Sequence, residues 1–372
     1  MRRRLFTWTV LALLLALAAE ARSRSLPSKK EAAVLLHDAA EARNLTSQGS
    51  PPFHLAAKVH YEIADRSFDG TYELFWASPD RYRKDYKAGT VSDTEVVLGN
   101  KLYVLRSTPI PDFLYWRTAT LLKSLYVGTS STAPRVSKVY AAELQGQKVI
   151  CIRSDVGSRE DQDCFQETTT GTTPFSEIEK RSSSYKLELD EFASLGGKFF
   201  PRKITEDRED GKLEVEVAEL NELGDSTRDI FVPQPAAKVY DRCAKPEIKG
   251  KMPYYRGFSS AQGMLLFGDS AGGSDLAGVG DFPYPPLPPT EKAVFVQYFL
   301  LIGTDGRAEF AAPMQTQGTL VGTARGKPAQ STVSLPDAEF QQWIGSERFP
   351  VRSCGGKPFE YEMTLREPLR VP

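Results

Sequence analysis

The sequence predicts an α+β fold, in which a curved antiparallel half-barrel sheet with a helix is followed by a small β-β-α-β second domain. Three observations lead to this prediction. Apolar and polar residues alternate with a period of two over most of 53–239. One proline-led amphipathic segment, 109–126, interrupts that alternation. A Gly-, Pro- and Ser-rich stretch, 244–290, then separates the sheet from a final segment, 291–372, that has its own strand and helix patterns.

The N-terminus has the three parts of a secretory signal peptide. Arg2, Arg3 and Arg4 precede an apolar run from Leu5 to Ala19, and the small residues Ala19 and Ala21 precede a cleavage point expected after Ala21. The run of about 15 residues is shorter than the roughly 20 needed to span a bilayer. We therefore assign 1–21 as a signal peptide and expect an exported protein that is soluble in the periplasm after cleavage. The alternative is an uncleaved signal kept as a membrane anchor.

Charge argues against one class of partner. The chain has 47 Lys and Arg against 48 Asp and Glu, and removing the three Arg and one Glu of 1–21 leaves 44 against 47. A net charge of about −3 gives no basic excess for phosphate contacts, so we expect no nucleic-acid partner.

The predicted elements follow in chain order. Glu31 to Asn44 has apolar residues at helical spacing and ends at a polar loop, which predicts an opening helix. From Phe53 to Ile63 the odd positions are apolar and the even positions polar, as in a strand with one buried face. Further strands are predicted at 71–76, 82–87, 94–98, 101–106, 138–144, 148–153, 185–189, 202–206 and 212–220. Gly99-Asn100 and Asp210-Gly211 mark hairpin turns between them.

The second domain has fewer elements. Val294 to Ile302 is predicted as a strand, Asp305-Gly306 as a turn and Arg307 to Ala312 as its partner strand. Ser334 and Asp337 form a capping pair for a helix on which Phe340, Trp343 and Ile344 share a face. Phe359 to Leu365 is the last strand. The domain boundaries are therefore 1–21, 31–243, the linker 244–290, and 291–372.

Four cysteines in an exported chain indicate two disulfides. Cys151 and Cys164 flank a polar stretch, as across a hairpin, so we predict that they pair with each other; Cys243 would then pair with Cys354. Four cysteines allow three pairings. A zinc site is not expected because no C-x-x-C spacing exists and all three histidines lie far upstream.

Residues 31–243 resemble the LolA and LolB type of periplasmic lipoprotein-carrier fold. The resemblance rests on Phe68 to Trp76 leading into Ser78 to Arg83, on Gly99 to Leu105, and on Gly196 to Arg202. It implies an opening helix followed by a long antiparallel sheet curled around a helix.

Residues 291–372 resemble the C-terminal domain of TonB, through Phe295 to Gly306, Phe340 to Phe349 and above all Phe349 to Leu365. The N-terminal apolar segment lacks the Ser/His motif of an energy transducer, the Pro-rich spacer is short, and Gln315 to Val333 is an insertion. The resemblance therefore implies the fold and a protein-docking role more than energy transduction.

One catalytic motif occurs by spacing alone. Gly268-Asp-Ser-Ala-Gly-Gly273 satisfies G-x-S-x-G, which would make Ser270 a serine-hydrolase nucleophile. A nucleophile elbow lies between a buried strand and a helix, whereas Ser270 lies in the Gly- and Pro-rich linker. No His follows His60, so an α/β-hydrolase order of catalytic residues is also absent. We expect no catalytic residue, and the hydrolase remains the third hypothesis.

Metal and cofactor sites are not predicted either. His54 and His60 lie six residues apart on the polar face of one strand, about 20 Å along it, which is too far to share a metal. Glu160, Asp161 and Asp163 lack the glycine and distal Glu of a calcium loop, so we interpret them as a solvated hairpin tip. No phosphate-binding glycine loop precedes a helix.

The first domain is rich in aromatic residues, whose simplest explanation is an ordinary core. Our functional hypothesis is that the concave face holds lipid or lipoprotein acyl chains under the 109–126 segment. The predicted ligand contacts are Leu74, Trp76, Tyr103, Phe113 and Trp116.

In the second domain, Phe359, Tyr361 and Met363 mark a strand edge that would bind an envelope protein by strand addition. The sequence thus predicts a non-enzymatic periplasmic carrier or sensor with a TonB-like docking module. The main alternative is a TonB-type energy transducer.

Overall fold

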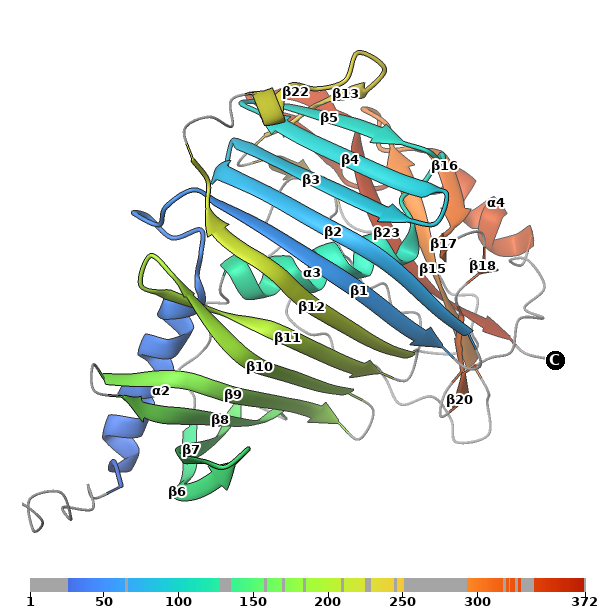
Figure 1. Ribbon diagram of the computed structural model, residues 1–372. Coiled ribbons are helices and arrows are strands. Elements are labelled where there is room, and N and C mark those ends of the chain that lie inside the picture. Colours follow the sequence, from blue (N-terminus) through green and yellow to red (C-terminus); the bar gives the residue numbers. More distant parts are fainter. Residues whose placement is uncertain are drawn as a thin grey trace, which may run out of the picture.

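The computed structural model (Figure 1) describes residues 26–63, 66–127, 135–156, 159–168, 171–182, 185–208, 211–224, 229–243, 246–250, 293–316, 319–320, 322–324, 327–328 and 338–370. The predicted signal peptide, Ser270, most of the predicted linker and the predicted helix cap at Ser334 lie outside these residues. The predicted fold class is confirmed, because a large curved antiparallel sheet, few helices and small separate sheets make up the described part of the chain.

Thirteen of the described strands form one antiparallel sheet, in the order β13-β5-β4-β3-β2-β1-β12-β11-β10-β9-β8-β7-β6. Most neighbouring strands in the sheet are also consecutive in the sequence. The two exceptions are β1, which pairs with β12, and β5, which pairs with β13. The strands are β1 Phe53–Ile63, β2 Arg66–Ser78, β3 Arg81–Ala88, β4 Val91–Leu98, β5 Lys101–Arg106, β6 Arg135–Leu144, β7 Gln147–Val156, β8 Arg159–Thr168, β9 Gly171–Ser182, β10 Tyr185–Leu195, β11 Lys198–Arg208, β12 Gly211–Glu222 and β13 Lys238–Asp241.

Strand β1 shows why the period-two pattern predicts the sheet. All its odd positions from Phe53 to Ile63 are buried and the even ones are exposed or half-buried. The odd residues join one continuous core with β2, β3 and β12, which is the face toward helix α3. Gly99 allows the tight turn between β4 and β5, because its φ of 60° lies in the left-handed region that favours glycine.

Two helices lie on the same side of this sheet (Figure 1). Helix α2, Lys29–Arg43, begins with a capping box between Ser28 and Glu31 and buries Ala32 and Leu36 against the β7–β8 region. Helix α3, Phe113–Val127, is the helix predicted within 109–126, and it lies across the concave face.

The C-terminal part builds smaller sheets. Strand β15, Ala293–Ile302, pairs with β16, Ala308–Pro313, and β19, Gly322–Ala324, and also with the last strand, β23, Tyr361–Arg370. Helix α4 spans Ala338–Ser346, so β15, β16, α4 and β23 form the predicted β-β-α-β unit. The remaining strands are β14 Glu247–Lys249, β17 Gln315–Thr316, β18 Thr319–Leu320, β20 Lys327–Pro328, β21 Val351–Cys354 and β22 Lys357–Phe359.

The C-terminal unit packs against the large sheet. Phe299 of β15 and Met314 belong to the same buried cluster as β1, β2 and α3, and Leu301 packs against it. The start of the predicted linker also joins this unit, because β14 pairs with β21.

Two interpretations from the sequence are wrong. Glu160, Asp161 and Asp163 are not a hairpin tip, because they lie within strand β8, and Asp161 and Asp163 are buried. Strand β9, which follows, has no counterpart among the predicted strands. In β5, Leu102 and Val104 are buried in the core on the concave face. Because side chains alternate along a strand, the half-buried Tyr103 between them points to the opposite face. Tyr103 therefore does not line the concave face, contrary to the prediction from the sequence.

Candidate functional site

Aromatic contacts seat helix α3 on the concave face. Tyr115 stacks on Tyr72 with ring centroids 6.4 Å apart and lies 5.4 Å from the ring of Tyr86. Phe113 contacts Tyr61 at 6.0 Å. At the other end of the helix, the ring centroids of Tyr126 and Trp76 are 6.1 Å apart. The helix thus fills the concave face along its length.

One ion pair also holds α3 to the sheet. Arg117, buried in the middle of the helix, donates from Nε to Glu206 of β11 at 3.0 Å and from Nη1 to the hydroxyl of Tyr61 at 3.1 Å. Its guanidinium also lies 4.9 Å from the centre of the Tyr61 ring. Breaking a buried pair by removing one partner costs about 3–5 kcal/mol. Arg117 therefore contributes strongly to holding α3 on the sheet, where most of the other contacts are apolar.

A second group of buried charges lies beside the helix, on β3, β4 and β5. Lys84 donates to Glu95 at 3.1 Å, and both side chains are almost fully buried. Burial works against the charged form of Glu95, but Lys84 and Arg106 together lower the pKa of its carboxyl. Asp93 differs: burial raises its pKa to about 7, although Arg106 opposes this. We call Lys84, Asp93, Glu95 and Arg106 the charged node.

The charged node reaches the C-terminal unit. Two terminal nitrogens of Arg106 donate to the carboxylate of Glu362 of β23, at 2.7 and 2.8 Å, and both side chains are almost fully buried. Its guanidinium also lies 5.7 Å from the ring centre of Phe299. A planar guanidinium is suited to such bidentate pairing with a carboxylate, so β23 is positioned by geometry as well as charge.

The predicted ligand contacts fall into two groups. Leu74 and Phe113 belong to the buried core, and Trp76 and Trp116 pack against it. Phe113 and Trp116 lie side by side on α3 with ring centroids 5.8 Å apart, as their spacing predicts. Tyr103 lies apart from these four. Their role in ligand binding stays a prediction.

Helix α3 occupies the place where the sequence predicts a ligand. A cavity of about 20 Å³, room for roughly one water molecule, lies instead at the seam between β5, β13 and the C-terminal unit. Leu102, Tyr240, Cys243 and Tyr361 are among the residues that line it.

The predicted partner edge is strand β23 and the turn before it. Tyr361 and Met363 lie in β23 with their side chains buried, opposite Ile302 and Leu300 of β15. Phe359 belongs to β22 and is half-buried. Within the described residues β15 is the only strand that pairs with β23, which leaves its other edge without a strand partner.

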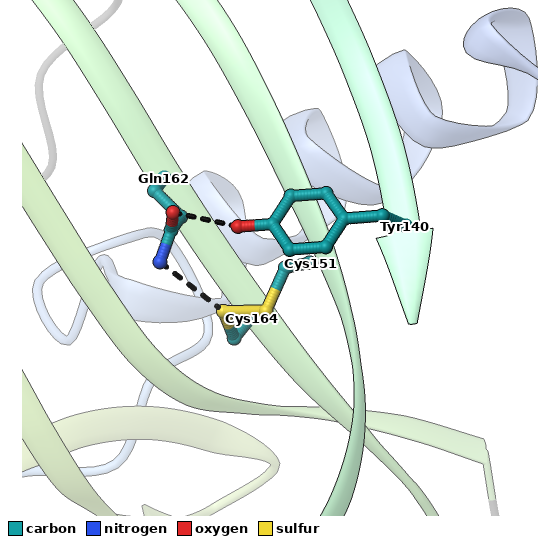
Figure 2. Close-up of a disulfide and its surroundings, with 4 residues drawn as sticks. All are labelled: Tyr140, Cys151, Gln162 and Cys164. Atoms are coloured by element: carbon teal, nitrogen blue, oxygen red, sulfur yellow. Dashed lines mark hydrogen bonds between the residues drawn. A yellow bond between two sulfur atoms is a disulfide. The ribbon is translucent and has the colours of Figure 1, made fainter. Parts of the chain in front are cut away.

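Both predicted disulfides are present. Cys151 and Cys164 join directly opposite residues of β7 and β8, with Cα atoms 4.1 Å apart. Figure 2 shows Gln162 linking Cys164 to Tyr140, whose hydroxyl donates to the Gln162 side-chain oxygen at 2.7 Å. Cys243 and Cys354 join the chain after β13 to β21 of the C-terminal unit.

A third buried charged group was missed from the sequence. Arg43, at the end of α2, contacts Glu177 of β9. Asp161, Asp163 and Glu179 lie on the same face of β8 and β9 and are buried. Burial and the neighbouring Glu177 raise the pKa of Asp163 well above its usual value, against the opposing effect of Arg43. Among the described residues, no group of three or more His, Cys, Asp or Glu is placed to hold a metal ion.

His54 and His60 lie on the outer face of β1. His54 stacks on Phe75 with ring centroids 4.4 Å apart. His60 contacts Asp69 at 2.7 Å and Glu62 at 3.3 Å, and the hydrogen bond to Asp69 raises its pKa. In the described part of the chain, no helix is both long and apolar enough to cross a membrane.

The comparisons with known proteins give distant structural likenesses. No family model and no curated protein match the sequence. A LolA-superfamily protein from Nitrosomonas europaea is 9% identical and aligns with 53% of this chain and 96% of its own, with a TM-score of 0.34. A DUF1329 family protein from Desulfovibrio piger is 10% identical and aligns with 55% of this chain and 98% of its own, with a TM-score of 0.33.

A third structure aligns with most of the chain. The MucA/MucB complex from Pseudomonas aeruginosa provides a chain that is 10% identical, with 91% of this chain and 94% of that one covered and a TM-score of 0.25. No TonB protein is among these three, so the C-terminal resemblance to TonB stays a prediction. At such low identities and TM-scores, the likenesses carry no argument for function.

Proposed function

We propose that this chain is a non-enzymatic periplasmic carrier or sensor that holds an acyl chain of a lipid or lipoprotein between helix α3 and the concave sheet. The observation that carries this proposal is the seat of α3. Nine of the fifteen residues of the helix are buried, and its partners on the sheet are mainly aromatic and aliphatic. A helix that moves away from such a seat leaves an apolar surface that an acyl chain can cover.

The energetics favour a ligand that takes the place of the helix. Burying apolar area is worth about 25 cal/mol per Å², so a few hundred Å² of uncovered wall costs several kcal/mol. An acyl chain that covers the same wall recovers that energy. Arg117 then sets the resting state, because its contacts with Glu206 and Tyr61 favour the seated helix in the absence of ligand.

The C-terminal unit supplies the docking surface in this proposal. In the described part of the chain β23 has a strand partner on one edge, β15, and an extended segment of an envelope protein can pair with the other edge. Tyr361→Pro is a poor test of this edge, because the Tyr361 hydroxyl donates to the Pro350 carbonyl in the core and the variant would disturb folding. Slower amide exchange across Tyr361–Arg370 when a partner peptide is added is the better measurement.

The ligand is tested by native mass spectrometry of protein prepared from the periplasm without detergent. We expect a bound lipid mass, or uptake of added lysophospholipid, that is lowered in the Phe113→Ala/Trp116→Ala double variant. The matched control is His54→Ala/His60→Ala, which alters the outer face of β1 and should retain lipid. A clean unliganded mass with no uptake would contradict the carrier function and leave a protein-binding scaffold.

Two further experiments separate the alternatives. A TonB-type transducer must remain in the inner membrane, whereas the carrier should fractionate with the soluble periplasm. Stoichiometric labelling of Ser270 by a fluorophosphonate probe, abolished in Ser270→Ala, would contradict the non-enzymatic proposal.

A further inference from the structure

The N-terminus of helix α3 is connected to the charged node. The Asp112 carboxylate accepts a hydrogen bond from the Leu114 N–H at 2.9 Å, so it caps the first turn of α3. The backbone N–H of the same Asp112 donates to Asp93 Oδ2 of β4 at 3.4 Å. The segment that starts the helix therefore contacts Asp93 directly.

Asp93 in turn contacts the residue that holds the C-terminal unit. Its Oδ1 lies 2.9 Å from Arg106 Nε, while the two terminal nitrogens of Arg106 engage Glu362 of β23. One contiguous series of contacts therefore runs from the start of α3 to β23, through Asp112, Asp93, Arg106 and Glu362. Asp93 and Glu362 are at most 1% exposed and Arg106 is 7% exposed.

Because these side chains are buried, losing any one contact in the series is expected to destabilise the remaining contacts. The charged node, Asp112 and Glu362 together hold four carboxylates, Asp93, Glu95, Asp112 and Glu362, and two cations, Lys84 and Arg106. Buried charges are strongly penalised when they lose partners, because water does not replace the lost interactions. If α3 departs, Asp93 loses a donor, and its pairing with Arg106 and the position of Arg106 against Glu362 must readjust.

From this geometry we infer that Asp93 and Arg106 couple the seating of α3 to the docking of β23, so that displacement of the helix by a ligand loosens the C-terminal unit. The coupling itself needs no ligand; its use as a signal rests on the proposed function. Because such a coupling is reciprocal, loosening β23 should also loosen α3. This arrangement would report an occupied lipid site to the surface that binds the protein partner.

The first test is amide hydrogen exchange of the full, unliganded chain in the Glu362→Gln variant. The variant keeps the shape of the side chain and removes the charge that Arg106 holds. We expect amides of α3 to exchange about 5-fold faster or more, the lower end of typical coupling between sites. The matched control is Glu360→Gln, because Glu360 faces the exposed Lys238 at 3.8 Å and is two residues from Glu362 along the chain. The control should leave α3 unchanged.

The second test starts from the helix and keeps the inference falsifiable if Glu362→Gln folds poorly. Arg117→Met loosens α3 at its contact with Glu206 and should speed amide exchange in β23. Above pH 7, where Asp93 is ionised, the same substitution in the Asp93→Asn background should have a much smaller effect on β23, since the amide cannot carry the charge that the carboxylate places beside Arg106. Amides of β7, which lies in a different buried cluster from α3, serve as the internal reference in every variant.

The coupling would be overturned if exchange stayed unchanged in α3 of Glu362→Gln and in β23 of Arg117→Met, or if it rose equally in β7. These outcomes are independent of lipid uptake. If lysophospholipid uptake fails while the coupling holds, the carrier function is wrong and the coupling remains. If uptake succeeds while the coupling fails, the protein carries lipid without this signal.

Discussion

The two ends of the large sheet are stabilised in different ways. Strands β1–β5 and β10–β12, with α3, share one cluster of 33 buried apolar residues, which we call the α3 half. Strands β6–β9, with α2, contain buried apolar clusters of four and three residues in the part of the chain that the structure describes; we call them the α2 end. The α2 end adds a cross-strand disulfide and the Arg43 group of buried charges. The α2 end has less apolar packing and is reinforced by a disulfide, whereas buried ion pairs occur in both parts.

The junction with the C-terminal unit combines both strategies. Phe299 and Met314 extend the apolar cluster of the α3 half, while Arg106–Glu362 and Cys243–Cys354 add an ionic and a covalent link. The comparison therefore predicts that contacts at the junction have the largest effect on stability, followed by those of the α2 end.

The largest effect is expected from removing the junction disulfide. Cys243 and Cys354 are 111 residues apart, and in the chain-entropy model closing a loop of that size stabilises the folded state by about 5 kcal/mol. We expect the Cys243→Ala/Cys354→Ala variant to lose stability of this order in urea unfolding followed by tryptophan fluorescence. A loss below about 1 kcal/mol would mean that the packed interface alone holds the unit in place.

The next largest effect is expected for Arg106→Met. The substitution leaves Asp93, Glu95 and Glu362 without their shared cation, and breaking a buried pair costs about 3–5 kcal/mol. The control is Lys101→Met, which removes the exposed pair with Asp241 and should cost less than about 1 kcal/mol. Equal urea midpoints for the two variants would contradict the central place of Arg106 at the junction.

The same contrast explains what the sequence can predict. Strand β1 and helix α3 are predictable because their burial follows short-range patterns: alternation in Phe53–Ile63, and a proline-led amphipathic segment before Val127. Strand β9 is not predictable because it carries charged residues, the half-buried Glu177 and the buried Glu179, which the composition of the segment indicates as solvent-exposed. The Arg43 that pairs with Glu177 lies 134 residues away.

The residues of the candidate site likewise divide into those that the sequence predicts and those that it does not. Phe113 and Trp116 are predictable from their helical spacing, and both disulfide pairings follow from the position of Cys151 and Cys164. The charged node is not predictable, because Arg106 and Glu362 are 256 residues apart and neither lies in a recognisable motif. Long-range pairing of single charges leaves no local signal in a sequence.

A smaller and local effect is expected at the α2 end. Cys151 and Cys164 close a short loop, with a sequence separation of 13, so Cys151→Ala/Cys164→Ala should cost about 3 kcal/mol. Because the buried clusters there are small, we expect faster amide exchange in β6–β9 and little change in α3. Equal acceleration in α3 would show that the two parts unfold as one unit and would remove the distinction between them.

The smallest effect is expected from pH, and it again compares the two parts. Asp93 in the α3 half has a pKa raised to about 7 by burial, above the value of about 3.9 in an unfolded chain. The folded state therefore binds the proton more tightly. Its stabilising contribution is complete below about pH 4 and is lost as the pH rises through 7, at no more than about 1.4 kcal/mol per pH unit.

This prediction is measured by urea unfolding at pH 5 and pH 7.5. The groups that face Asp93 are Arg106, Glu95, Asp112, Tyr86 and Tyr115, and they remain in the Asp93→Asn variant, so the difference between the two proteins isolates Asp93. We expect the unmodified chain to lose more stability than Asp93→Asn between these pH values.

Asp163 at the α2 end has a pKa raised in the same direction, and Asp163→Asn should also weaken the pH dependence. Amide exchange then locates each effect: with Asp93 the pH-dependent amides should lie in α3 and β23, and with Asp163 in β8 and β9. The reverse assignment would contradict the separation of the sheet into two parts with different sources of stability.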